Sequence, residues 1–196
     1  LFLEEAGLEY EPVAVDTRKG EQFAPAFLAV NPNGKVPAIA DGDAIIFDSN
    51  AILLYLAEKT GRFMPRDVRG RYDVMQWLMF QMASVGPMLG QTHHFPVYAP
   101  EPIKYATDPY TNEAARTYNV IDRRLGEVPY LAGDYSIADM AVFPWVRGYE
   151  RQGQKLEDYP NLKRWYETID ARPPVQRGLA LLAERRRPVA AMDDKQ

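Results

Sequence analysis

A proline-containing turn in the first third of the chain has the backbone chemistry of a peptide-binding site. The segment is Asn33-Gly34-Lys35-Val36-Pro37, and a run that is typical of a buried strand follows it. Proline has no N–H to donate to a β-ladder, so a strand that opens with proline must be entered through an unusual backbone. A cis peptide at Val36-Pro37 would turn the Val36 N–H and C=O outward, where an extended peptide ligand could pair with them. A trans proline at an ordinary strand start fits these five residues equally well.

Two residues at the predicted start of a helix have the chemistry to hold an amino-acid head group. Asp48 and Ser49 precede a helical pattern that runs from Asn50 to Thr60 and ends at Gly61. The free N–H groups and the positive dipole of a helix N-terminus favour a carboxylate, and the Asp48 side chain can bind an ammonium group. The alternative, which an isolated Asp-Ser pair favours, is plain N-capping of the helix by Ser49.

The spacing between the two motifs favours the ligand-binding interpretation. Pro37 and Asp48 are 11 positions apart, and Asp41-Gly42-Asp43 lies between them as a hairpin signal. A single hairpin would bring both motifs to the same end of a small sheet, where a peptide backbone and an amino-acid head could be bound together. A γ-glutamyl tripeptide that carries a thiol fits this arrangement.

The composition excludes several classes of function. The chain has 196 residues, of which 46% are hydrophobic, so it can bury a core. It has 23 Lys and Arg against 27 Asp and Glu, a net charge of −4, which argues against nucleic acid as a partner. It has no cysteine, which excludes a Cys nucleophile, a thiolate metal site and a C-x-x-C motif. Any thiol chemistry therefore needs a thiol supplied by a ligand.

Neither a membrane nor a metal is predicted as a partner. No apolar run approaches the roughly 18 residues of a membrane span. His93 and His94 are the only histidines, their adjacent side chains diverge, and no third ligand lies at a useful spacing. The sequence therefore predicts no metal site.

The order of elements predicts two units with a boundary near residues 61–67. Strand and helix signals alternate before it, and helical patterns follow it. This indicates an α/β plus all-α fold, with a thioredoxin-like domain at 1–62 that lacks its first strand and an all-helical domain at 68–196. The first helix begins without a cap, so we expect that an N-terminal segment is missing from the sequence. The predicted strands are 10–16, 36–40 and 44–47, and a proline-rich loop is predicted at 96–110. The predicted helices are 23–31, 50–60, 69–89, 113–125, 137–153, 160–172 and 175–184. Gly7 is predicted to end the first helix and Pro87 to act as a helix breaker, while Ser136 and Asp139 form a capping box that opens the helix at 137–153.

Four stretches of the chain resemble the cytosolic glutathione transferases. They are NGKVPAI at 33–39, FDSNAILLYLAEK at 47–59, YSIADMAVFPW at 135–145 and YPNLKRW at 159–165. The stretch at 77–95 is most similar to the bacterial nu class. The resemblance covers essentially the whole chain and implies a thioredoxin-like domain followed by a helical domain, in a homodimer. It also implies glutathione as the substrate and reduction of small disulfides in preference to conjugation of electrophiles.

The resemblance implies a glutathione site built around the two motifs. Val36 would pair with the cysteinyl backbone of glutathione beside a cis Pro37, and Asp48 and Ser49 would hold the γ-glutamyl head. The residues that it assigns to glutathione are Gln22, Lys35, Val36, Pro37, Asp48 and Ser49.

Two features of the nu class have no match in this sequence. The Thr and Asn that hydrogen-bond the glutathione sulfur have no counterpart, so the catalytic residue is unknown and is expected N-terminal to Leu1. Pro109 stands where the class has an Arg that reaches the partner's glutathione, which leaves a second bound glutathione open. Tyr98 and Tyr105, in the predicted proline-rich loop, could close over the substrate cleft.

Three functions remain open from the sequence. The first is a cytoplasmic glutathione-dependent disulfide reductase, in which a thiolate activated by hydrogen bonds at a helix N-terminus attacks a small disulfide. The second is a detoxification enzyme that conjugates glutathione to small hydrophobic electrophiles. The third is a scaffold that binds glutathione without turnover.

Overall fold

The N-terminal segment begins with a short helix and continues as extended chain. The structure is a computed structural model that describes residues 1–97 and 104–183. α1 (Phe2–Ala6) ends at Gly7, whose φ of 64° is the left-handed C-cap that the sequence predicts. The strand predicted at 10–16 is wrong, because the only sheet in the described residues is a hairpin further along the chain and no strand lies beside this run. The helix predicted at 23–31 is reduced to a 3₁₀ turn (Glu21–Phe23) and α2 (Pro25–Leu28).

A hairpin and a helix complete the N-terminal part as predicted. β1 (Ala38–Asp41) and β2 (Ala44–Phe47) pair antiparallel, with Ala38 opposite Phe47. Gly42, at φ 59°, supplies the backbone conformation that the tight turn requires. α3 (Ser49–Thr60) follows directly on β2 and ends at Gly61.

The next region is an almost continuous helical rod. α4 (Val68–Phe80) passes through a π-helical turn (Gln81–Val85) into α5 (Gly86–Val97), so the predicted break at Pro87 is wrong. Pro87 falls in the first turn after the π-helical segment, where a missing N–H is tolerated. α6 (Lys104–Glu127) contains Pro109 in its interior, so much of the loop predicted at 96–110 is helical. Packing of α5 against α6 overrides these local proline signals.

The C-terminal helices differ from the prediction mainly at their ends. α7 (Ile137–Val146) stops earlier than expected, and a 3₁₀ turn (Tyr149–Gln152) follows it. α8 (Pro160–Asp170) begins at a proline as predicted. α9 (Pro173–Ala180) also starts on its prolines, which were expected only to end the preceding helix, because proline is well tolerated in the first turn.

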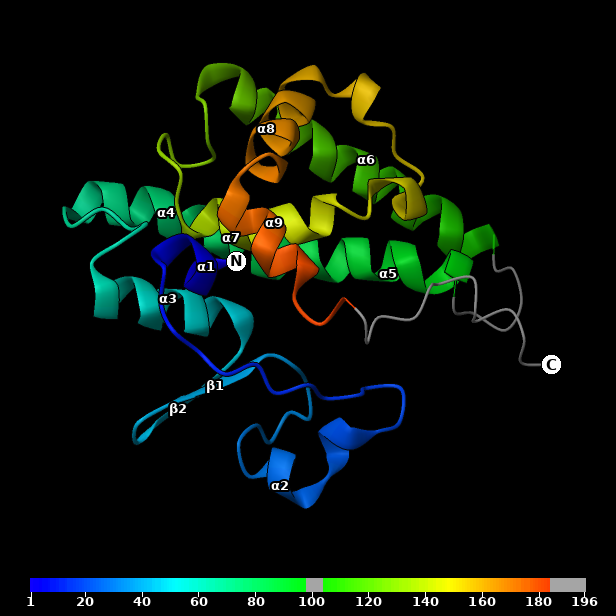
Figure 1. The fold of residues 1–196 in the computed structure, drawn as a ribbon. Coiled ribbons are helices and arrows are strands. Elements are labelled where there is room, and N and C mark those ends of the chain that lie inside the picture. Colours follow the sequence, from blue (N-terminus) through cyan, green and yellow to red (C-terminus); the bar gives the residue numbers. More distant parts are fainter. Residues whose placement is uncertain (98–103, 184–196) are drawn as a thin grey trace.

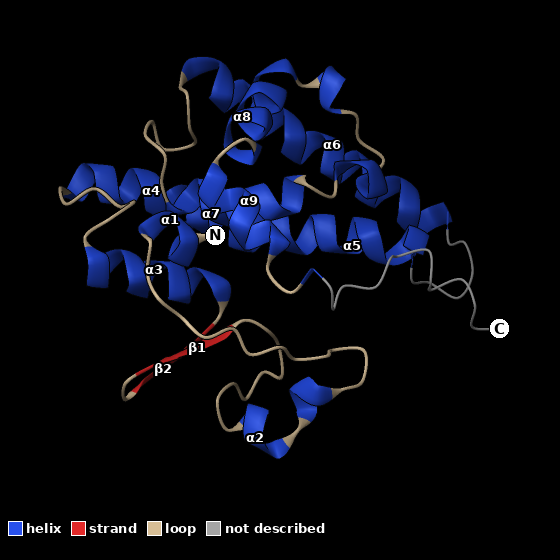
Figure 2. Cartoon of the chain, in the orientation of Figure 1, coloured by secondary structure: helices blue, strands red, loops and turns tan. Residues whose placement is uncertain are grey.

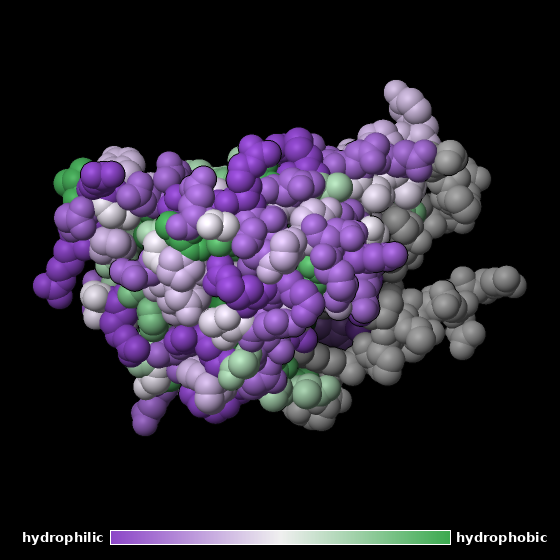
Figure 3. All heavy atoms as spheres, turned by 90° about the horizontal axis from the view of Figure 1, so that it is seen from above, coloured by the Kyte–Doolittle hydropathy of each residue, from purple (hydrophilic) through white to green (hydrophobic). Residues whose placement is uncertain are grey.

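The core lies where the helices meet, away from the hairpin. α1 packs on α9 and α3 packs on α7, so both parts of the chain share one set of buried side chains, while the hairpin and α2 lie together on one side of the helices (Figures 1 and 2). Leu78, Tyr118, Phe143 and Trp165 are fully buried in this core. The opposite face, over α6 and α8, is largely hydrophilic (Figure 3). No helix in the described residues is long and apolar enough to cross a bilayer.

The capping box predicted at the start of α7 is present and fully buried. Asp139 is inaccessible to solvent, and its Oδ1 accepts hydrogen bonds from the Leu131 amide at 3.0 Å and Trp165 Nε1 at 2.8 Å. Its Oδ2 accepts from the Ser136 amide at 3.0 Å and from the Ser136 hydroxyl. Burial raises the pKa of the Asp139 carboxyl to about 6, and these hydrogen bonds oppose the rise.

Candidate functional site

The turn before β1 presents a free stretch of backbone. The Val36-Pro37 peptide is cis, as the resemblance implies. Val36 is 49% exposed, and within the described residues neither its N–H nor its C=O has a protein hydrogen-bond partner. Gly34, at φ 60°, lets the chain turn sharply into this stretch. An extended peptide could therefore pair with both backbone groups of Val36.

The start of α3 is capped by Asp48, so the alternative in which Ser49 is the cap does not hold. Asp48 Oδ1 accepts the amide hydrogens of Asn50 at 2.9 Å and Ala51 at 3.3 Å, while Ser49 is the first helical residue. Asp48 has φ 72° and ψ 128°, a strained conformation outside the left-handed helical region, and its side chain lies over the helix start. Its Oδ2 has no partner among the described residues and the side chain is exposed, so its charge is available to an ammonium group.

The hairpin brings the two motifs together. Ala38 pairs with Phe47, so the residues just outside that pair, Pro37 and Asp48, lie at the same end of the hairpin. Pro37 and Ser49 both line a cavity of about 380 Å³. We call the six residues at this end the hairpin rim: Gln22, Lys35, Val36, Pro37, Asp48 and Ser49.

The other two predicted residues lie beside the same turn. Lys35 is exposed and immediately precedes Val36. The Gln22 backbone carbonyl faces Gly34, since a Cβ added to Gly34 would lie 3.5 Å from it. Gln22 Oε1 is buried and has no partner in the described part of the chain. The hairpin rim therefore combines a basic side chain, an acidic side chain and free backbone groups, and two of its residues, Pro37 and Ser49, line the cavity.

The cavity behind the hairpin rim has the character of a protein core. Side chains of α1, β1 and α3 line one side, and Met140, Pro144 and Trp145 of α7 form the other. The charged ends of a tripeptide fit the polar rim. The apolar interior of the cavity suits the apolar part of a ligand instead. Of the two tyrosines expected to cover the cleft, Tyr105 lies on α6 with 92% of its surface exposed, and Tyr98 is outside the described residues.

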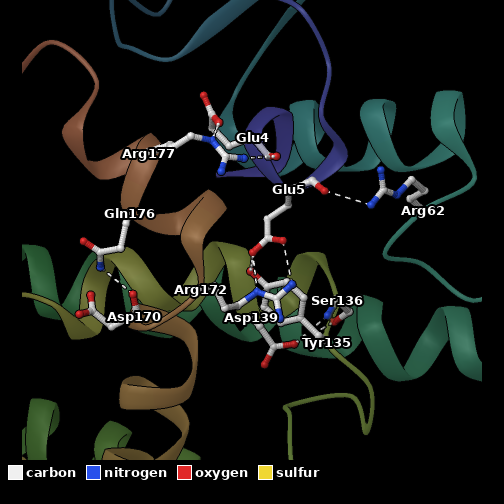
Figure 4. Close-up of polar contacts among 10 residues, drawn as sticks. All are labelled: Glu4, Glu5, Arg62, Tyr135, Ser136, Asp139, Asp170, Arg172, Gln176 and Arg177. Carbon is white, nitrogen blue, oxygen red and sulfur yellow. Dashed lines mark hydrogen bonds and ion pairs between the residues drawn. The ribbon is translucent and has the colours of Figure 1, made fainter.

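A cluster of ion pairs fixes α1, whose first residues line the cavity, on the helical part (Figure 4). Glu5 is buried and accepts two hydrogen bonds from Arg172, at 2.6 and 2.8 Å, and one from the Tyr135 hydroxyl at 3.2 Å. Arg177 binds Glu4 at 2.7 Å on the exposed side of the same junction. The sequence analysis missed these residues, because no local pattern connects positions about 170 residues apart.

The described part of the chain places no metal cluster at His93 or His94. No group of three His, Cys, Asp or Glu side chains in the described residues is placed to hold a metal ion. His93 Nε2 lies 3.4 Å from the Gly148 carbonyl, and its ring packs against the Gly148 backbone. His93 therefore packs α5 against the turn that follows α7.

Family models match both parts of the chain. The model described as glutathione S-transferase, N-terminal domain, matches residues 1–58, and the model for the C-terminal domain matches residues 86–173. Two proteins of Escherichia coli strain K12 are similar in sequence. Disulfide-bond oxidoreductase YfcG is 49% identical over 93% of this chain and 87% of its own length, and disulfide-bond oxidoreductase YghU is 40% identical over 91% of this chain and 66% of its own.

Solved structures agree with the sequence comparison. A glutathione transferase from Burkholderia graminis has a TM-score of 0.85 at 42% identity, over 91% of this chain and 80% of that one, and holds two glutathione molecules per subunit. A glutathione transferase from Pseudomonas putida has a TM-score of 0.86 at 39% identity, over 92% of this chain and 84% of that one, with one glutathione disulfide per subunit. These likenesses confirm the predicted fold class, an N-terminal α/β part followed by a helical part.

Proposed function

Because the chain belongs to the glutathione S-transferase family, we propose that it binds glutathione at the hairpin rim and uses it to reduce small disulfides. The observation that carries the proposal is the juxtaposition of the free Val36 backbone with the Asp48 carboxylate at one end of the hairpin. The names of the E. coli relatives and the glutathione bound in the similar structures support the same ligand and reaction class.

The hairpin rim would bind glutathione through its backbone and its charged ends. Val36 N–H would donate to the cysteinyl carbonyl, and Val36 C=O would accept the cysteinyl N–H. The free Oδ2 of Asp48 would take the γ-glutamyl ammonium, while the first amides of α3 and the Ser49 hydroxyl would take its carboxylate. Lys35 and Gln22 would lie along the remainder of the peptide. This arrangement directs the thiol toward the cavity.

The disulfide exchange needs no sulfur from the protein. A glutathione thiolate attacks one sulfur of the substrate disulfide, which forms a mixed disulfide and releases the other sulfur as a thiolate. A second glutathione thiolate then attacks the glutathione sulfur of the mixed disulfide, giving glutathione disulfide and the second substrate thiol after protonation by solvent. All the sulfurs belong to ligands, which is consistent with a chain that has no cysteine. Met140 and Trp145 offer an apolar wall for the substrate.

Two kinetic assays on the full-length protein test the reaction type. We expect glutathione-dependent reduction of hydroxyethyl disulfide to exceed conjugation of glutathione to chlorodinitrobenzene. Faster conjugation would favour the electrophile-conjugating alternative. Glutathione binding without either activity would favour a scaffold, and no glutathione binding would refute the proposed site. A glutathione-rich, reducing compartment such as the cytoplasm suits the proposed reaction.

We also propose that the protein is a homodimer joined through an apolar stripe on α4. Val68, Tyr72, Met75 and Met79 recur at helical spacing and so share one face. Val68 and Tyr72 are more than 70% exposed, which is unusual for a row of large apolar side chains and typical of an interface. The face over α6 and α8 is largely hydrophilic by comparison (Figure 3).

Sedimentation velocity tests the proposed dimer. We expect the unmodified protein to sediment as a dimer and the double variant Tyr72→Glu, Met79→Glu to sediment as a monomer. Tyr105→Glu, which adds a charge at a 92% exposed tyrosine on another helix, is the matched control and should remain dimeric. A monomeric unmodified protein would refute the dimer.

A further inference from the structure

We infer that Asn31 is a positioning residue for glutathione, because it orients the peptide group that presents the Val36 N–H. This inference rests on the proposed function and extends it to a residue that is only 2% exposed and cannot itself touch the ligand. The sequence analysis assigned no role to Asn31.

The Asn31 side chain bridges the turn before Val36. Its Nδ2 donates to the Lys35 carbonyl at 2.5 Å, and its Oδ1 accepts from the Asn33 amide at 2.9 Å. The two partners fix the orientation of the side-chain amide, since a carbonyl can only accept and a backbone N–H can only donate. The side chain is therefore held in one orientation by two hydrogen bonds of opposite sense.

The backbone of Asn31 anchors the same side chain to the end of α2. Its N–H donates to the Phe27 carbonyl at 2.8 Å, and its C=O accepts from the Gly34 amide at 3.0 Å. The Asn31 backbone is therefore hydrogen-bonded both to the end of α2 and to the turn that follows it. These bonds fix the position from which its side chain donates to the Lys35 carbonyl.

The hydrogen bond to Lys35 sets the direction of the Val36 N–H. The Lys35 carbonyl and the Val36 N–H belong to one peptide group, and in a trans peptide they point in opposite directions. Val36-Pro37 is the only cis peptide in the described residues, so the Lys35-Val36 peptide is trans. Because buried Asn31 holds the carbonyl inward, the N–H is directed outward to solvent, where the cysteinyl carbonyl of glutathione would meet it.

Asn31→Asp is the sharpest test, because it keeps the shape and the Oδ1 acceptor. The variant replaces the donor to Lys35 by an oxygen that repels the carbonyl, so the peptide group loses its orientation. We expect the Kd for glutathione, measured by calorimetry, to rise about tenfold, the usual effect of losing one hydrogen bond. KM for glutathione should rise in parallel, with kcat changed less than twofold.

Asn33→Asp is the matched control. It makes the same change of charge two residues away, on an exposed side chain that has no hydrogen bond in the described structure, and should leave the Kd within twofold. Circular dichroism and a thermal melt identify folded variants. If Asn31→Asp does not fold, Asn31→Ser removes both side-chain bonds without adding charge and is expected to raise the Kd similarly.

A modified ligand separates positioning from a general loosening of the turn. In a glutathione analogue with a thioamide between Cys and Gly, the weakly accepting sulfur replaces the oxygen that Val36 N–H would bind. The unmodified protein should bind this analogue several-fold more weakly than glutathione, and Asn31→Asp should discriminate less than twofold. Equal discrimination by a folded variant, or an unchanged Kd for glutathione, would overturn the inference alone. No glutathione binding by the unmodified protein would overturn the proposed function together with it.

Discussion

The chain contains two helix caps made from an aspartate, and they differ in what the carboxylate has left to bind. At α7, Asp139 is buried and both of its oxygens are occupied by donors from within the protein. At α3, Asp48 is exposed, one oxygen caps the helix, and the other has no partner in the described residues. An aspartate caps a helix at both sites. At α7 all of its hydrogen-bonding capacity is used within the core, whereas at α3 one carboxylate oxygen remains free to bind a ligand.

Removing the buried carboxylate should produce the largest effect on stability. Asp139→Ala would leave the amides of Leu131 and Ser136 and the Trp165 ring N–H without an acceptor inside the core. We expect the free energy of unfolding in urea to fall by about 3–5 kcal/mol. Asp158→Ala, at an exposed position before α8, is the control and should change it by less than about 0.5 kcal/mol. Similar losses in the two variants would contradict the contrast between buried and exposed carboxylates.

The pH dependence of stability should identify the same group. Because the pKa of Asp139 rises from its ordinary value of 3.8 to about 6 on folding, the folded state binds more protons between these pH values. The contribution of Asp139 therefore falls as the pH rises through this window, by about 3 kcal/mol in total. In Asp139→Asn this dependence is lost, so the stability difference between the two proteins should be about 2 kcal/mol smaller at pH 7 than at pH 4. A difference that does not change with pH would contradict the raised pKa.

The junction of α1 with α9 shows the same difference between a buried and an exposed carboxylate, here in two ion pairs (Figure 4). The Glu5 side chain is 3% exposed and that of its partner Arg172 is 32% exposed, whereas Glu4 is 20% and its partner Arg177 57% exposed. Arg172→Ala would leave a buried carboxylate without its cation, and we expect it to lower the free energy of unfolding by about 3 kcal/mol. Arg177→Ala, the matched variant one turn further along, should cost less than about 1 kcal/mol. Equal effects would show that burial does not decide the strength of these pairs.

The sequence predicted local features well and long-range ones poorly. The hairpin and the α7 capping box follow from residues that are close in the chain, so spacing and turn chemistry were sufficient to find them. The same residues left Val36-Pro37 open between cis and trans, and only the resemblance implied the cis form that the structure has. The buried Glu5–Arg172 pair joins residues 167 positions apart, and nothing near either residue signals the other. The continuation of helix past Pro87 and Pro109 depends on packing between α5 and α6, which local propensity does not report.

The sequence predicted that the two motifs lie at one end of the hairpin, but not which residue of the second motif caps α3. The motifs indicated that Asp48 and Ser49 act together, but they considered only Ser49 as a possible cap, whereas Asp48 is the residue that caps α3. The positive φ of Asp48, which turns its side chain over the first amides of α3, is a property of the strand-to-helix connection and not of the dipeptide. Asn31 escaped notice for a similar reason, since its role depends on the direction of a peptide group four residues later.

The smallest expected effect separates the two tasks of the exposed cap. Asp48→Asn keeps an oxygen that can accept the Asn50 amide and tolerates a positive φ, so the helix cap should survive and the free energy of unfolding should change by less than about 0.5 kcal/mol. The charge that would bind the γ-glutamyl ammonium is lost, and we expect glutathione binding to weaken by about 1.5–3 kcal/mol in calorimetry. Asp43→Asn, in the exposed hairpin turn, makes the same substitution away from the hairpin rim and should change neither quantity. If Asp48→Asn lowered stability but left glutathione binding intact, Asp48 would be a cap and nothing more, and the contrast with Asp139 would be one of burial alone.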